Sequence, residues 1–163
     1  MEVSINLQVA DQDERPGDPL GDAAGLAALL RLRSEDWYSR RTAVEDLRVL
    51  RTRYHDAGYY FVDAEPRRSL DVQAAPASID VRIRPGPVTT IERIDVAGAT
   101  RIPEASIRKE LLVKAGDRYR ESRVAETADR LKALGLFRRV DVKYDRIEGH
   151  DDRVALTIQV EAK

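Results

Sequence analysis

Residues 131–137, Leu-Lys-Ala-Leu-Gly-Leu-Phe, join the end of an apolar helix face to a glycine and then to two large apolar residues that enter a strand. Residues 54–60, Tyr-His-Asp-Ala-Gly-Tyr-Tyr, have the same design, and their glycine lies 135 − 58 = 77 positions earlier. A glycine directly after a helix suits the left-handed backbone conformation that ends many helices. Two such junctions, one small-domain length apart, predict a two-unit repeat.

The chain is punctuated near its middle by Pro85, Gly86 and Pro87. Two prolines around a glycine cannot continue a helix or a central strand, so these residues predict a turn or a short linker. We therefore expect one domain over residues 1–86 and a second over residues 87–163.

Alternation of apolar and polar residues predicts the same set of strands in both halves. In the second half the strands are expected over 90–96, 139–144 and 153–160, and in the first half over 3–9, 60–65 and 79–83. The stretch 90–96 is less regular near Ile91. Pro66 is expected to end the middle strand of the first half, because proline cannot donate to a sheet.

Apolar residues at helical spacing predict two helices after the first strand of each half. In the second half, one helix is expected to begin at Pro103 and another to run over 121–134 and stop at Gly135. The first of these would bury Ile107, Leu111 and Leu112. In the first half, one helix is expected over about 20–32, and the other ends at Gly58 and carries Ala43, Leu47, Leu50 and Tyr54.

The expected fold is therefore α+β, with two tandem β-α-α-β-β modules. Each strand has one apolar face, so each three-stranded mixed sheet needs only one covering layer, which the two helices supply. The other face carries charged and polar residues and should meet solvent. Such a sheet also has edge strands, whose unpaired N–H and C=O groups can accept a strand from another polypeptide.

Composition narrows the possible functions. The 28 Lys and Arg residues nearly balance the 29 Asp and Glu residues, for a net charge of −1, which argues against a nucleic-acid partner. The absence of cysteine excludes disulfides, thiolate metal sites and cysteine nucleophiles. No apolar run approaches the roughly 20 residues that cross a bilayer, and the N-terminus lacks the features of a signal peptide.

No group of residues in the sequence predicts catalysis, a cofactor or a metal, so we expect a non-enzymatic protein. Residues 150–152, His-Asp-Asp, and the acidic stretch 11–14 could be metal ligands, but a solvated turn and a flexible loop explain them better. His55 is expected on the surface at a helix end. Among the aromatic residues at the two junctions, Tyr60 and Phe137 are expected inside and Tyr59 outside.

Five stretches of the chain are distinctive: residues 58–62 (Gly-Tyr-Tyr-Phe-Val), 84–87 (Arg-Pro-Gly-Pro), 94–98 (Ile-Asp-Val-Ala-Gly), 116–119 (Gly-Asp-Arg-Tyr) and 130–140. In this order they resemble POTRA (polypeptide-transport-associated) domains of BamA/TamA-type outer-membrane β-barrel assembly proteins. The likeness covers nearly the whole chain and is weakest over 1–36. Two departures are the long acidic loop over 10–17 and Ala99, at a position where the family usually has asparagine.

The resemblance implies that the middle strand of each module lies at a sheet edge. It also implies a periplasmic role in passing unfolded outer-membrane proteins to a membrane-embedded barrel of the same protein, and in docking accessory lipoproteins. The binding edge of the first module would comprise Phe61, Val62, Asp63, Ala64 and Glu65. That of the second would comprise Arg138, Arg139, Val140, Asp141, Val142, Lys143 and Tyr144.

Two alternatives keep the fold and change the role. The modules could be rigid spacers that bind no client, or they could belong to a two-partner secretion transporter or a division protein with a POTRA-like domain. In every case Gly58, Gly135, Pro85, Gly86 and Pro87 are expected to have structural roles.

Overall fold

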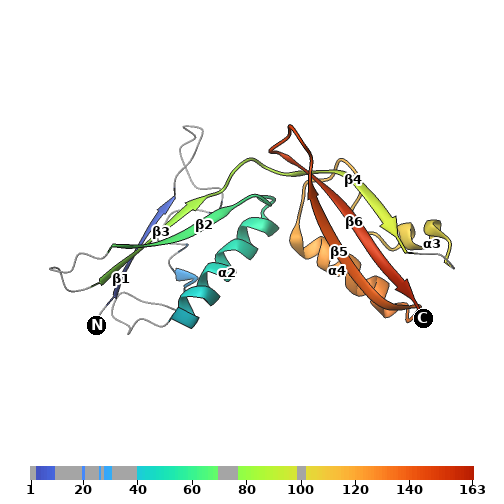
Figure 1. Cartoon of the computed structure of the whole chain (residues 1–163), viewed down its shortest axis with the longest axis horizontal. Helices are drawn as coiled ribbons and strands as arrows, with labels where there is room; N and C mark the ends of the chain where they lie inside the picture. The colour runs from blue at the N-terminus through green and yellow to red at the C-terminus, as the bar shows by residue number, and fades with distance from the viewer. Residues whose placement is uncertain are drawn as a thin grey trace. The chain divides into compact units, whose positions relative to one another are not determined.

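The computed structural model describes residues 3–9, 20, 26, 28–30, 40–69, 77–98 and 102–163. The chain divides into two compact units, Met1–Gly86 and Pro87–Lys163. Each unit has a three-stranded mixed sheet with helical structure against it, which confirms the expected fold class (Figure 1). Between the units, residues 85–89 belong to no helix or strand, and Gly86 has a φ of 72°.

The second unit is built around a central strand that is last in the chain. Strand β6 pairs in parallel with β4 on one side and antiparallel with β5 on the other. The register of β4 shifts between Ile91 and Arg93, where the sequence pattern is irregular. The elements are β4 (Thr90–Ala97), α3 (Glu104–Lys109), α4 (Glu121–Ala133), β5 (Phe137–Arg146) and β6 (Arg153–Ala162).

Alternating apolar residues of β6 form the floor of the second core. They are Val154, Leu156, Ile158 and Val160, none more than 3% exposed. Ile107 of α3 and the α4 residues Val124 and Leu131 are also buried. Burial of these side chains under two helices leaves the opposite face of the sheet to charged residues, as the alternation predicts.

Helix α3 is shorter than the sequence predicts, and Leu111 and Leu112 lie beyond its end, half-buried. The helix ends in a tight turn, in which the N–H of Glu110 donates to the carbonyl of Ile107, three residues earlier. The N–H of Leu112 then donates to the hydroxyl of Thr127, at 3.1 Å. That hydroxyl donates in turn to the carbonyl of Arg123, so α4 itself stops α3 from continuing.

The first unit repeats the same strand order. Strand β3 is central, parallel to β1 and antiparallel to β2. The elements described are β1 (Val3–Val9), α2 (Arg40–Asp56), β2 (Asp63–Ser69) and β3 (Ala77–Arg84). Of the helix expected over 20–32, only residues 20, 26 and 28–30 are described. The buried core comprises Leu26, Leu30, Leu50, Tyr54, Ala64, Val81 and Ile83.

Strand β2 begins and ends later than the sequence predicts. Phe61 and Val62 precede the strand, because the chain first turns after α2 with the N–H of Val62 donating to the carbonyl of Tyr59. Pro66 does not end the strand but pairs with Val81 inside it. A proline is tolerated there because β2 is an edge strand, where a missing N–H need not break the ladder.

The expectation for Tyr59 was wrong, because this ring lies against the core instead of in solvent. Its N–H donates to the carbonyl of Tyr54, at 2.9 Å, and its ring meets the Tyr54 ring edge-on. Tyr60 is half-buried and stacks on His55, with ring centroids 5.7 Å apart. Phe137, at the corresponding junction of the second unit, is buried as expected.

Backbone conformation limits substitution of the glycines after α2 and α4, whereas a steric contact limits substitution of Gly98. Gly58 and Gly135 have φ values of 97° and 70°, and a methyl group at Gly135 would meet open space. Gly98 follows β4 with a φ of 88°, and a methyl group there would overlap the carbonyl oxygen of Val160. The backbone of β6 therefore excludes any side chain at position 98.

We predict that Gly98→Ala lowers the free energy of unfolding by about 3 kcal/mol or more, because the overlapping atom is a backbone oxygen that cannot move aside. Gly135→Ala should cost only about 1 kcal/mol, the strain of a positive φ. Urea unfolding of the two variants tests this order. Equal losses would show that the close approach at Gly98 does not exist in solution.

Candidate functional site

Sheet edges are the candidate site, and each sheet has two of them. The strand orders β1-β3-β2 and β4-β6-β5 place β1, β2, β4 and β5 at edges. The expected binding stretch 138–144 lies wholly within β5. The expected stretch 61–65 enters β2 only from Asp63, so Phe61 and Val62 are corrected to the preceding turn.

The outer side of β4 is occupied by the segment that links α3 to α4. The N–H of Ile91 donates to the carbonyl of Asp117, at 2.9 Å, and the N–H of Gly116 donates to the carbonyl of Ile91, at 2.8 Å. The N–H of Tyr119 donates to the carbonyl of Thr89, at 2.9 Å. The segment that links α3 to α4 therefore also pairs with this strand.

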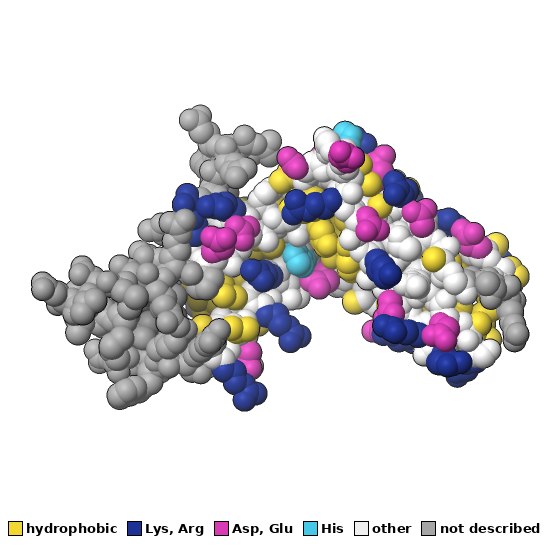
Figure 2. All heavy atoms as spheres, viewed as in Figure 1, with side chains coloured by type: hydrophobic (Ala, Val, Ile, Leu, Met, Phe, Trp, Pro, Cys, Tyr) yellow, Lys and Arg dark blue, Asp and Glu magenta, His cyan; other side chains and the backbone are white. Residues whose placement is uncertain are grey.

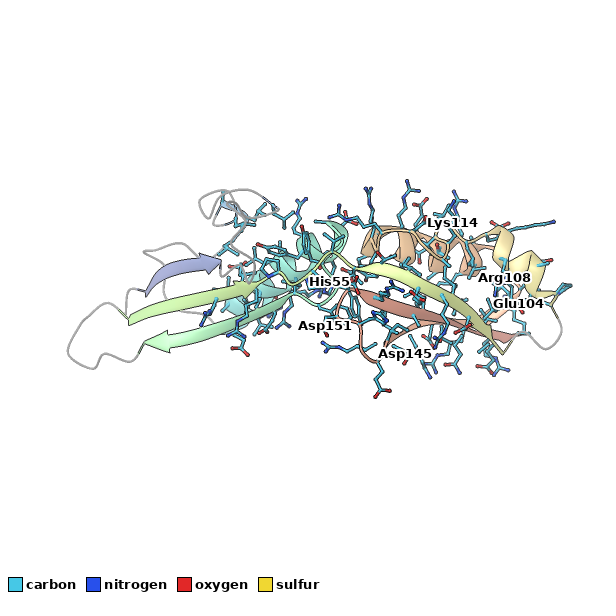
Figure 3. The ribbon with its side chains drawn as sticks, turned by 90° about the horizontal axis from the view of Figure 1, so that it is seen from above. His55, Glu104, Arg108, Lys114, Asp145 and Asp151 are labelled. Carbon is cyan, nitrogen blue, oxygen red and sulfur yellow. The ribbon has the colours of Figure 1, made fainter. Side chains whose placement is uncertain are left out.

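Farther along β4, an arginine side chain donates to an outward carbonyl that a neighbouring strand would otherwise bond. Arg108 of α3 donates from its guanidinium to the carbonyl of Ile94, at 3.3 Å, while Glu104 holds the same guanidinium at 2.7 Å. Figure 3 labels Arg108 and Glu104 on α3. Backbone and side-chain donors thus close much of the β4 edge from within the unit.

The direction of the backbone groups on β5 follows from those on β4. Ile91 has a buried side chain, and both its N–H and its C=O bond to the linking segment instead of β6. Strand β5 lies on the other side of β6 and runs in the opposite direction. A rotation of 180° about the normal of the sheet places β4 on the position and in the direction of β5. This rotation leaves the helix-covered face unchanged, and groups that point away from β6 still do so. The helix-facing residues of β5 therefore also point their N–H and C=O away from β6.

The helix-facing residues of β5 are identified by their partners on β6. Val140, Val142 and Tyr144 pair with Val160, Ile158 and Leu156, all of which are buried. The backbone groups of these three β5 residues therefore form the rim. Within the part of the chain that the structure describes, no backbone hydrogen bond from a turn or loop reaches Val140 or Val142.

Side chains flanking the β5 rim differ between its two faces. On the face away from the helices, Arg139, Asp141 and Lys143 line a shallow open depression together with Gly98, Gln159 and Glu161. Arg139 pairs with Asp141 at 2.5 Å, and Arg138 with Glu161 at 3.7 Å. On the helix face, Val142 is only half-buried although its partner Ile158 is 1% exposed, so apolar surface continues to the rim.

The β2 rim has a different pattern of backbone groups. Arg51 of α2 donates from its guanidinium to the carbonyl of Ala64, at 3.0 Å. Ala64 is buried and pairs with Ile83, and Asp63 pairs across the strands with Arg84 at 3.4 Å. Ala64 of β2 thus corresponds to Val140 and Val142 of β5, because its side chain faces the helix and its backbone groups point away from the central strand.

The remaining candidate residues form no chemical site in the described part of the chain. His150, Asp151 and Asp152 lie exposed in the turn between β5 and β6, and no group of three potential metal ligands is found among the described residues. Residues 11–14 lie outside them. Acidic and basic side chains intersperse on the visible face in Figure 2. Every described helix is too short or too polar to span a bilayer.

The side chain of Tyr144, at the end of the β5 rim, packs against the core. Its ring meets the ring of Tyr119 edge-on with centroids 6.0 Å apart, and Tyr119 is 1% exposed. Burial raises the pKa of the Tyr144 hydroxyl above its ordinary 10.0, a side-chain hydrogen bond with Tyr119 opposes the rise, and the charge of Glu121 adds to it. The folded unit therefore favours the neutral phenol.

Comparisons with known proteins agree with this architecture. The POTRA family model, described as a surface antigen variable number repeat, matches residues 17–86 and 89–163. The outer membrane protein assembly factor BamA of Neisseria meningitidis serogroup B is 23% identical over 137 residues, which are 84% of this chain and 17% of that protein. BamA of Neorickettsia risticii is 24% identical over 130 residues, which are 80% and 18%.

Solved structures show the same fold. The crystal structure of Haemophilus influenzae BamA POTRA3-5 matches with a TM-score of 0.80 and 20% identity, over 98% of this chain and 61% of that one. BamA from Haemophilus ducreyi lacking POTRA domains 1-3 matches with a TM-score of 0.76 and 15% identity, over 100% and 30%. The family model and the curated relatives confirm the resemblance to POTRA domains, and the solved structures confirm the fold. The chain spans 17–18% of the length of the curated relatives.

We predict that Val142→Pro is better tolerated than Lys143→Pro. The N–H of Val142 points out of the sheet, so proline there removes no ladder bond, whereas proline at Lys143 removes a bond to β6 and should cost about 3 kcal/mol. Thermal unfolding measures the difference. A greater loss at position 142 than at 143 would reverse the assigned direction of the rim.

We predict that stability falls as the pH rises above about 10, because Tyr144 ionises in the unfolded chain before it ionises in the folded one. Below that pH both states are neutral and the residue adds no pH dependence. Tyr144→Phe should remove this part of the slope in urea unfolding between about pH 9 and 11. Parallel curves for the two proteins would contradict the raised pKa.

Proposed function

Since the chain belongs to the POTRA family, we propose that its two units are non-catalytic, periplasmic polypeptide-binding modules of a BamA-type outer-membrane assembly factor. Their partners would be unfolded outer-membrane β-barrel proteins, accessory lipoproteins of the assembly complex and a membrane-embedded barrel of the same protein. Binding would occur by addition of a strand at a sheet edge, with residues of β2 and β5 as the candidate acceptors.

The observation that carries this proposal is the contrast between the two edges of the second unit. The β4 edge bonds to residues 116–119 and to Arg108, whereas no described turn or loop bonds to the backbone of Val140 or Val142 on β5. An unpaired row of N–H and C=O groups is a template for another strand. Such bonding uses the main chain, so it can serve clients of different sequence.

The side chains beside the rim suit a strand with two different faces. In an added strand, alternate residues would lie beside Val142 and Tyr144, and the others beside Arg139, Asp141 and Lys143. Strands of outer-membrane barrels alternate apolar and polar residues in this way. Because Arg139 and Asp141 already pair, neither charge sign of client is strongly preferred.

The charges also limit how strongly a client is held. Each exposed ion pair near the rim contributes about 0–1 kcal/mol, and the whole chain has a net charge of −1. A short strand would therefore bind mainly through backbone hydrogen bonds and a narrow apolar strip. Weak and reversible contact of this kind suits a module that passes a client onward.

We predict that a peptide of about ten residues from a barrel strand shifts the amide NMR signals of Val140, Val142 and Tyr144, since a transmembrane strand has roughly that length. The matched control is the same peptide N-methylated at alternate residues, which keeps its side chains but cannot pair along one edge. We expect the control to bind at least about tenfold more weakly, the loss of one or two hydrogen bonds.

Two results would contradict strand addition. Equal binding of the N-methylated peptide would mean that side chains, not the main chain, hold the client. Absence of any response to either peptide would instead favour the spacer role, in which the modules hold other parts of an assembly at a set distance.

A further inference from the structure

The two candidate acceptor edges differ in the backbone groups they present. Val140, Val142 and Tyr144 of β5 each carry an N–H and a C=O that point away from β6. On β2, the corresponding outward positions begin at Ala64 and recur at every second residue, which includes Pro66. The strand directions and neighbours match in the two units, so the same rim geometry applies to both.

At Ala64 the outward carbonyl already has a charged donor. The guanidinium of Arg51 lies 3.0 Å from that oxygen and reaches it from α2, 13 residues earlier in the chain. A strand added to β2 would have to displace this guanidinium or leave one of its own N–H groups unpaired. A hydrogen bond from a charged donor is stronger than the neutral bond that would replace it.

At Pro66 the rim lacks a donor altogether. Proline has no N–H, and its position opposite Val81 places it two residues beyond Ala64, in the same backbone orientation. A carbonyl of an added strand would have no partner there. Prolines and charged side chains at edge strands are known devices that prevent unwanted strand pairing.

The second unit supports this interpretation through its own closed edge. There Arg108 of α3 donates to the carbonyl of Ile94 on β4, as Arg51 of α2 donates to Ala64 on β2. In both cases a helix supplies an arginine to an edge-strand carbonyl. Within the described part of the chain, no arginine donates to the carbonyl of Val140 or Val142 on β5.

We propose that β5 is the strand-accepting edge of this pair of units, and that Arg51 and Pro66 close β2 to the same clients. The inference rests on the proposed function and narrows it from two acceptor edges to one. Its occupant is an extended strand of alternating apolar and polar residues. Loss of two main-chain bonds at β2 weakens that edge by about tenfold or more relative to β5.

The test uses the full chain and the barrel-strand peptide, with binding at each edge followed by amide NMR. In the unchanged chain we expect shifts over 140–144 and none over 63–68. In the double variant Arg51→Ala, Pro66→Ala, both edges should respond. Arg48→Ala, which removes a neighbouring exposed arginine of α2, is the matched control and should behave as the unchanged chain.

Further variants keep the test decisive. If the double variant unfolds the first unit, Arg51→Ala alone leaves the ladder intact and should still give a response at β2, weaker than that of β5. Val142→Pro should weaken the response of β5 in every background, because proline at this outward position removes one donor, as Pro66 does on β2. In the double variant it should leave the response of β2.

The outcomes separate this inference from the function it rests on. Equal responses of β2 and β5 in the unchanged chain would overturn the inference while supporting strand addition. So would a β2 edge that stays silent after Arg51 and Pro66 are replaced, if β5 still binds. Silence at both edges in all variants would overturn strand addition itself, and with it the inference.

Discussion

The unsatisfied main chain of an edge strand is the constraint on which this structure depends. A buried or half-buried N–H or C=O must find a partner, and a three-stranded sheet cannot supply one on its outer sides. In the second unit the loop at 116–119 and Arg108 meet this need along β4. On β5 the outward groups of Val140 and Val142 remain, and the proposed strand addition is assigned to this edge for that reason.

The helices determine which backbone groups are presented at the rim. They cover one face of each sheet, so side chains that face them alternate with charged residues, and backbone direction alternates with side-chain direction. Val142 can therefore offer its N–H and C=O to another chain while its side chain remains against the core. Packing below the sheet and hydrogen bonding at its edge are thus linked by the stereochemistry of one strand.

The proposed site is made of backbone, and such a site would explain why residue types say so little about function. Catalysis and metal binding need particular side chains, whereas strand addition needs only an accessible row of amides. Side chains then matter through whether they bond to the outward backbone groups of an edge strand, as Arg51 bonds to the carbonyl of Ala64. The two units share one fold, and a single arginine and a single proline are enough to make their edges different.

Local patterns in the sequence determined the repeat, the order of the elements and the positive-φ glycines after α2 and α4. These features depend on neighbours within a few residues, through alternation, helical spacing and helix ends. Contacts between distant residues decided the rest. The end of α3 depends on the Thr127 hydroxyl, the closure of β4 on residues 116–119, and the identity of Gly98 on the Val160 carbonyl. The donation from Arg51 to Ala64 has no sequence pattern, because only the packing of α2 against β2 brings them together.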